Sequence, residues 1–188
     1  MRETFYIENL GCAKNQVDAE VMITSLREGG YVQASSPSDA GIIIINTCGF
    51  IEEAKKESLD TLFSYRKQFP GKKILLAGCF AQRYGSELFP TLTEADAVFG
   101  NGDPSLIPEA VERLSKGERF LSVPEAGCIG GIRTELLSTP GSAYVKIAEG
   151  CNHRCSYCAI PLIRGNLRSR ERAEIVAEIK SLLARGIF

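Results

Sequence analysis

Several features of membrane, secreted and nucleic-acid-binding proteins are missing from this sequence. No apolar run approaches the ~20 residues that a membrane-spanning helix needs. The first residues include acidic side chains and no long apolar segment, so they do not read as a signal peptide. The net charge is only -1 at pH 7, which does not favour a nucleic-acid partner. We therefore expect no membrane association.

Histidine is almost absent, whereas cysteine is abundant. The 188 residues include one histidine and seven cysteines. Without a secretory signal, this many cysteines predict a reducing compartment, the cytoplasm, where thiols ligate metals or take part in chemistry. The length allows one domain of medium size and part of a second.

Short apolar runs alternate with segments of helical periodicity in the first two thirds of the chain. The expected strands are 4–9, 31–33, 42–45, 74–77 and 97–99. The expected helices are 15–28, with Asn15 as its cap, 50–65, 82–88 and 105–114. The run of four isoleucines at 42–45 is too short for a helix and fits a strand buried on both faces. The alternation predicts an α/β fold with a doubly wound parallel sheet.

The pattern breaks down after residue 117, where proline and glycine recur. We expect an N-terminal α/β domain at 1–117, a linker with a short hairpin at 118–142, and the start of a second domain at 143–188. That second part would contain a strand at 143–148 and a helix at 173–185. The helix would bury one apolar face, made by Ile175, Val176, Ile179, Leu182 and Leu183.

Three cysteines gather in one short stretch of the second part. Cys151, Cys155 and Cys158 have a C-x3-C-x2-C spacing. Three thiolates within eight residues cannot all lie on one face of a regular helix or strand. They can converge on one point if the backbone loops around a group bound between them. An iron–sulfur cluster fits, because thiolates are the ligands that it needs. Three ligands leave one iron of a four-iron cluster open to a small molecule.

This loop, with Tyr157 directly before its last cysteine, resembles the cluster loop of the radical S-adenosylmethionine enzymes. The resemblance implies a 4Fe-4S cluster that binds S-adenosylmethionine, with Tyr157 near the adenine, at the start of a radical-SAM (β/α) barrel. A barrel needs about 200 residues, so the sequence would be a fragment of one.

Other readings of the loop remain open. A structural zinc ion usually has four ligands, and His153 is a candidate for the fourth, although it lies inside the first cysteine interval. Disulfides would leave one of the three cysteines unpaired. Beyond the loop, Arg164, Arg168 and Arg170 could contact a carboxylate or an anionic substrate, or could form a solvated basic face.

A second group of three cysteines is far apart in sequence but shares one structural position. Cys12, Cys48 and Cys79 each follow an expected strand. The carboxyl ends of parallel strands meet at one edge of a sheet, so these thiols are expected to lie together there. Gly11, Gly49 and Gly78 flank them. Three buried structural cysteines are the alternative, but the shared placement favours a second three-ligand cluster.

Together the two cysteine sets resemble the methylthiotransferase family. The resemblance covers essentially the whole chain and rests on LGCAKN at 10–15, NTCGFI at 46–51, GCFAQRY at 78–84 and the loop at 149–170. It implies two 4Fe-4S clusters, one held by Cys12, Cys48 and Cys79 and the other by Cys151, Cys155 and Cys158. The seventh cysteine, Cys128, matches no ligand of the family.

Within the family, the residues after Cys48 are most like the branch that modifies a small-subunit ribosomal protein, S-twelve. That branch inserts a methylthio group at the β-carbon of an aspartate, using S-adenosylmethionine and an electron donor such as flavodoxin or ferredoxin. Ala13 departs from the proline that this branch often has. Two alternatives stay open: a tRNA adenosine methylthiotransferase, and, from another class, an iron–sulfur electron carrier. Ferredoxin sites use four cysteines for each cluster, and neither set here has a fourth.

Overall fold

Six parallel strands form the centre of the structure, a computed structural model that describes residues 3–187. Their order in the sheet is β2-β1-β3-β4-β5-β6. The strands are β1 (Thr4–Asn9), β2 (Val32–Gln33), β3 (Ile42–Thr47), β4 (Lys73–Gly78), β5 (Ala97–Gly100) and β6 (Phe120–Ser122). The chain starts at β1, adds β2 on one side and then adds β3 to β6 in turn on the other side. The predicted doubly wound parallel sheet is confirmed.

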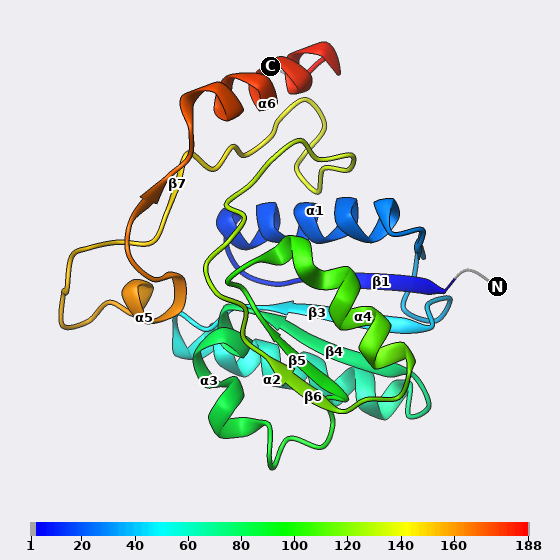
Figure 1. The fold of residues 1–188 in the computed structure, drawn as a ribbon. Helices are drawn as coiled ribbons and strands as arrows, with labels where there is room; N and C mark the ends of the chain where they lie inside the picture. Colours follow the sequence, from blue (N-terminus) through cyan, green and yellow to red (C-terminus); the bar gives the residue numbers. More distant parts are fainter. Residues whose placement is uncertain (1–2, 188) are drawn as a thin grey trace.

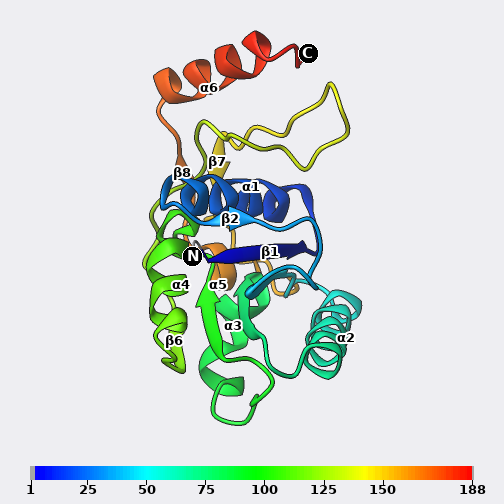
Figure 2. The same ribbon diagram turned by 90° about the vertical axis from the view of Figure 1, so that its right-hand side faces the viewer.

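Helices cover both faces of this sheet (Figures 1 and 2). They are α1 (Ala13–Glu28), α2 (Glu52–Gln68), α3 (Cys79–Leu88) and α4 (Ile107–Ser115), the last preceded by a 3-10 turn at Pro104–Leu106. α1 and α4 pack on one face, while α2 and α3 pack on the other. This arrangement follows from right-handed crossovers between parallel strands.

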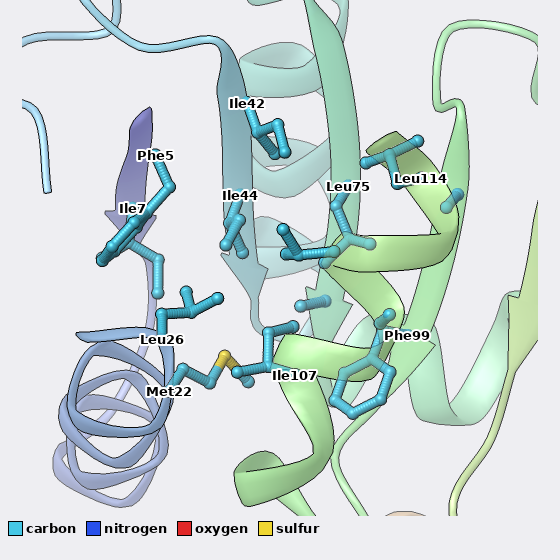
Figure 3. Packing of buried hydrophobic residues seen from close by; sticks show 14 of the residues in the cluster. Phe5, Ile7, Met22, Leu26, Ile42, Ile44, Leu75, Phe99, Ile107 and Leu114 are labelled. Carbon is cyan, nitrogen blue, oxygen red and sulfur yellow. The ribbon is translucent and has the colours of Figure 1, made fainter. Parts of the chain in front are cut away.

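Alternate residues of each central strand supply the two cores. Ile42 and Ile44 of β3 face α1 and α4, whereas Ile43 and Ile45 face α2 and α3. Figure 3 shows the first core, in which Met22 and Leu26 of α1 approach β1 and β3. All four isoleucines are fully buried, as expected for a strand covered on both faces.

The remaining elements form a smaller, more open part. They are β7 (Ala148–Glu149), α5 (Ile160–Arg164), β8 (Arg168–Ser169) and α6 (Arg172–Ala184). β7 and β8 pair antiparallel. In Figure 1, α5 lies beside the main sheet and α6 stands beyond α1. No helix within residues 3–187 is both long enough and apolar enough to cross a membrane.

Several expected boundaries differ from the structure. α1 begins at Ala13 with Cys12 as its cap, so Asn15 is not the cap. α2 begins at Glu52 and α3 at Cys79. The linker contains no hairpin, because residues 120–122 instead add β6 to the sheet beyond β5. The sheet therefore continues past the expected boundary at 117. Residues 1, 2 and 188 of the expected domains lie outside the described part.

The expected strand at 143–148 is also wrong. Among the described residues, only Ala148 and Glu149 of this stretch belong to a strand ladder, with β8. Residues 143–147 add no further ladder pair, although the Arg170 N–H donates to the Ile147 carbonyl at 3.0 Å. The expected inward face of α6 is wrong as well. Leu182 is buried, but Val176, Ile179 and Leu183 are exposed. α6 instead turns Glu178 inward, where it pairs with arginines.

Candidate metal centre

The first cysteine set, Cys12, Cys48 and Cys79, lies at the carboxyl edge of three neighbouring strands. Cys12 follows β1, and Cys48 and Cys79 directly follow β3 and β4. These strands are adjacent in the sheet. All three residues line one cavity of about 880 Å³. The expectation that these residues lie at one sheet edge is confirmed, while their role as ligands of one cluster stays a prediction.

Three helices begin around this cavity. Cys12 caps α1, Cys79 is the first residue of α3, and α2 begins shortly after Cys48. A helix N-terminus carries partial positive charge and free N–H groups, so it stabilises anions, including thiolates. The arrangement therefore favours a negatively charged group that three thiolates hold.

Glycines let the chain segments approach each other closely here. Gly11 and Gly78 have φ angles of 94° and 93°, which favour glycine. A Cβ on Gly11 would lie 2.7 Å from Cys48 Cβ, and one on Gly78 would lie 2.5 Å from Asn46 Oδ1. The glycines are therefore required by contacts within the protein itself, whatever the cavity holds.

Buried polar side chains hold the backbone around Cys48. Ser58 Oγ accepts a hydrogen bond from the Cys48 N–H and donates to the Ala54 carbonyl at 2.8 Å. Asn15 Nδ2 lies within hydrogen-bond distance of the carbonyls of Leu10, Asn46 and Thr47. These bonds fix the loop ends that carry Cys12 and Cys48.

Cys79 is the most buried thiol of the set and has the most polar contacts. Its Sγ accepts hydrogen bonds from Arg164 Nη2 at 3.1 Å and from Asn101 Nδ2 at 3.3 Å. Burial raises the pKa of the Cys79 thiol to about 11, and the Arg164 charge opposes part of this rise. Binding a metal would remove the proton, because a thiolate is the ligand.

The second cysteine set, Cys151, Cys155 and Cys158, lies on an irregular segment between β7 and α5. Cys155 is exposed, and the other two are half-buried. The Cys151 N–H donates to the Gly165 carbonyl at 3.1 Å, and the Cys158 N–H donates to the Cys155 carbonyl at 3.0 Å. The loop thus curls back on itself, and α5, which follows it, lines the cavity of the first set.

The two cysteine sets offer the type of ligand that iron–sulfur clusters require. In the described part of the chain, no three His, Cys, Asp or Glu side chains converge closely enough to hold a single metal ion. A four-iron cluster is wider than one ion, and thiolate is its preferred ligand. Three thiols around a cavity of about 880 Å³ satisfy that requirement for the first set. The second set offers three thiols on one curled loop.

A buried cluster of charged side chains joins the two regions. Arg164 Nη1 lies 2.9 Å from Asp18 Oδ2 and 2.8 Å from Glu149 Oε2, and Lys146 pairs with both acids. Burial alone would raise the pKa of the Glu149 carboxyl, but the charges of Arg164 and Lys146 outweigh it and hold the pKa at about 2. Lys14 of α1 pairs with Glu149 from the solvent side.

The three arginines beyond the loop are not a solvated basic face. Arg164 is buried against Asp18, Glu149 and Cys79. The side chain of Arg170 is 4% exposed and pairs with Glu178. Arg168 donates to the Gly127 carbonyl at 2.8 Å. The contacts of Arg164 and Arg170 are ion pairs within the protein, which the pattern of basic residues alone did not reveal.

Tyr157 and Cys128 lie apart from these contacts. Tyr157 is 87% exposed on the loop, so its role at an adenine stays a prediction. The Cys128 thiol donates to the Gly130 carbonyl at 3.1 Å in the segment between β6 and β7. Neither residue lines the cavity of the first set.

Sequence reasoning missed the polar residues that support the cysteines. Asn15, Asp18, Asn46, Ser58 and Asn101 are all buried. The sequence does contain a sign of their burial. Each is a polar residue at a position that the helical periodicity, or the end of an apolar strand, predicts to be buried. A buried polar group needs a partner, so such positions mark a network even before the partner is known.

Comparisons with known proteins bear on the whole chain. Residues 4–100 match the protein family described as Uncharacterized protein family UPF0004. Three similar relatives carry the name ribosomal protein uS12 methylthiotransferase RimO. The identities are 44% to the protein of Treponema denticola, 46% to that of Moorella thermoacetica and 45% to that of Heliobacterium modesticaldum. The alignments cover 95%, 95% and 97% of this chain, and 40%, 41% and 41% of the relatives. The chain thus spans about 40% of the length of the curated relatives that it matches.

Proposed function

Since this chain belongs to the family described as Uncharacterized protein family UPF0004, we propose that it is part of a radical S-adenosylmethionine methylthiotransferase. One observation carries the proposal: three thiols far apart in sequence line one cavity, beside a loop with three further thiols. Each thiol set would hold a 4Fe-4S cluster, with Cys12, Cys48 and Cys79 as one ligand set and Cys151, Cys155 and Cys158 as the other. Tyr157 would lie near the adenine of S-adenosylmethionine.

We propose that the substrate is the β-carbon of an aspartate in ribosomal protein uS12. The name that the three relatives share, together with identities of 44 to 46%, supports this choice. The protein would act in the cytoplasm and receive electrons from a carrier such as flavodoxin or ferredoxin. Residues 143–187 would begin the radical-SAM domain, after the α/β domain and a connecting segment.

When bound, the clusters and S-adenosylmethionine would supply the radical, sulfur and methyl chemistry that an unactivated C–H bond requires. The chain itself supplies position and electrostatics. Cys12 and Cys79 lie at the N-termini of α1 and α3, whose partial positive charge would favour the negatively charged cluster that these residues would hold. Ser58 holds the backbone of Cys48, and Ile160 and Ile163 of α5 contribute apolar surface to the lining of the cavity.

Iron counting on the full-length protein tests this proposal. After anaerobic reconstitution with iron and sulfide, we expect about eight irons per chain, as two four-iron clusters require. Replacing Cys12, Cys48 and Cys79 together by alanine should lower the count to about four. Cys128→Ala is the matched control, because this cysteine lies outside both sets, and it should leave the count unchanged.

Four irons in both the parent and the triple variant would mean that the first cysteine set is structural. The protein would then have one cluster and no second site for sulfur. If both clusters are present, incubation with S-adenosylmethionine, a reductant and isolated uS12 should change the mass of that protein by the replacement of one hydrogen with a methylthio group. Modification of tRNA in place of uS12 would overturn the proposed substrate but not the proposed methylthiotransferase activity.

A further inference from the structure

One arginine makes polar contacts with both regions that carry the cysteine sets. Arg164, the last residue of α5, is 7% exposed. Its Nη2 donates to Cys79 Sγ at 3.1 Å, and its Nη1 lies 2.8 Å from the carboxylate of Glu149, which stands just before Cys151. The side chain therefore reaches a thiol of the first set from the segment that carries the second.

Cys79 differs from the other two thiols of its set. Asn101, which follows β5, adds a second N–H donor to its sulfur at 3.3 Å. Among residues 3–187, the sulfur atoms of Cys12 and Cys48 accept no hydrogen bond from a side chain. The two donors thus act on one thiol of the three, and they do so in a buried environment where hydrogen bonds are strong.

We propose that Arg164 and Asn101 raise the reduction potential of the cluster held by the first set, and that Arg164 has the larger effect. This inference rests on the proposed function. Hydrogen bonds to the ligand sulfur atoms stabilise the reduced cluster more than the oxidised one, because reduction adds negative charge. The guanidinium is charged, and a charge-assisted hydrogen bond is about twice as strong as a neutral one.

Removal of Arg164 would also change the charges around Cys79, and this change would lower the reduction potential further. Asp18 and Glu149 share its guanidinium, so in its absence two buried carboxylates would lose a partner close to Cys79. Their negative charge disfavours reduction further. Lys146 pairs with the same two acids but has no contact with Cys79, which makes it the matched control.

The test uses the full-length protein with Cys151, Cys155 and Cys158 replaced by alanine, so that one cluster gives the signal. An iron count near four confirms that this cluster is present. A redox titration followed by electron paramagnetic resonance then gives the midpoint potential. Arg164→Met should lower the ratio of reduced to oxidised cluster at fixed potential about tenfold, which is about 59 mV for a one-electron couple. Asn101→Leu should lower it less, and Lys146→Met least.

Each result has a defined meaning. An unchanged potential in an Arg164→Met variant that retains its iron would overturn the inference, and so would an equal shift in Lys146→Met, which would indicate a general field effect. If the Arg164→Met variant loses its iron, the Asn101→Leu variant tests the inference instead. A lowered midpoint potential in that variant supports the inference, and an unchanged potential refutes it. An iron count near zero in the parent with only the first set would instead refute the proposed function.

Discussion

At the scale of single residues, the position of Cys48 depends on a side chain that no cysteine motif contains. Ser58 lies in the second turn of α2, and its hydroxyl oxygen is 3.2 Å from the Cys48 nitrogen. The same hydroxyl donates to the Ala54 carbonyl one turn earlier. Ser58 thus ties the loop after β3 to the helix that follows it.

Ser58→Ala should destabilise the chain by about 1 to 3 kcal/mol, because the buried Cys48 N–H would lose its partner. Urea unfolding of the iron-free protein under reducing conditions measures this change. Ser64→Ala is the control, since Ser64 lies exposed on the same helix. It should change the free energy of unfolding by less than about 0.5 kcal/mol. Equal effects of the two substitutions would contradict a specific role for Ser58.

At the scale of elements, the junction of β4 and α3 carries Cys79 without any intervening loop. Gly78 ends the strand and Cys79 begins the helix. The chain turns there through the positive φ of Gly78, where an added Cβ would lie 2.5 Å from Asn46 Oδ1 and 2.6 Å from the Thr47 carbonyl oxygen. A side chain at this position would meet atoms of β3, so glycine sets the distance between the ends that carry Cys48 and Cys79.

Gly78→Ala should therefore cost about 2 to 5 kcal/mol, from a left-handed backbone and from overpacking against β3. Gly117→Ala is the matched control, because Gly117 also has a positive φ of 82° but no atom within 4 Å of an added Cβ. It should cost about 1 to 2 kcal/mol. Thermal unfolding followed by circular dichroism distinguishes the two. A Gly78→Ala variant no less stable than Gly117→Ala would show that the close approach is not needed.

At the scale of the whole molecule, ion pairs hold the smaller part against α1. Asp18 contacts Arg164 and Lys146, and Glu20 contacts Arg133 between β6 and β7. Arg133 also pairs with Glu178 of α6. Burying such charges is costly, and breaking one partner leaves the others uncompensated. The orientation of the two cysteine sets relative to each other therefore depends on these pairs being complete.

Glu149 makes the packing of the smaller part against α1 sensitive to acid. Its pKa falls from 4.5 to about 2 in the folded chain, where the charges of Arg164 and Lys146 outweigh the effect of burial. The carboxylate thus stabilises the fold above pH 4.5, by on the order of 3 kcal/mol, and this stabilisation is lost as the pH falls from 4.5 towards 2. Glu149→Gln should lower the urea midpoint at pH 7 but have a shrinking effect between pH 4 and pH 3. A difference that stays constant over this range would contradict the assignment.

Much of the α/β domain could be predicted from the sequence because its signals are local. The isoleucine run of β3 is buried on both faces, and the alternation of strands and helices implies parallel pairing. The predictions failed where the outcome depended on neighbours. Residues 143–147 have the composition of a strand, yet within the described chain they form no strand ladder. Val176, Ile179 and Leu183 of α6 are exposed because no element within residues 3–187 covers them.

The sequence by itself determined that Cys12, Cys48 and Cys79 would meet, because each follows a strand and parallel strands end at one edge. The close spacing of the other three cysteines is likewise a property of the sequence. Only the tertiary structure revealed what surrounds them. Arg164, a basic residue among several in the sequence, is buried between Cys79 and two carboxylates. Such contacts join positions far apart in the chain, and no local pattern encodes which charge reaches which partner once the elements pack.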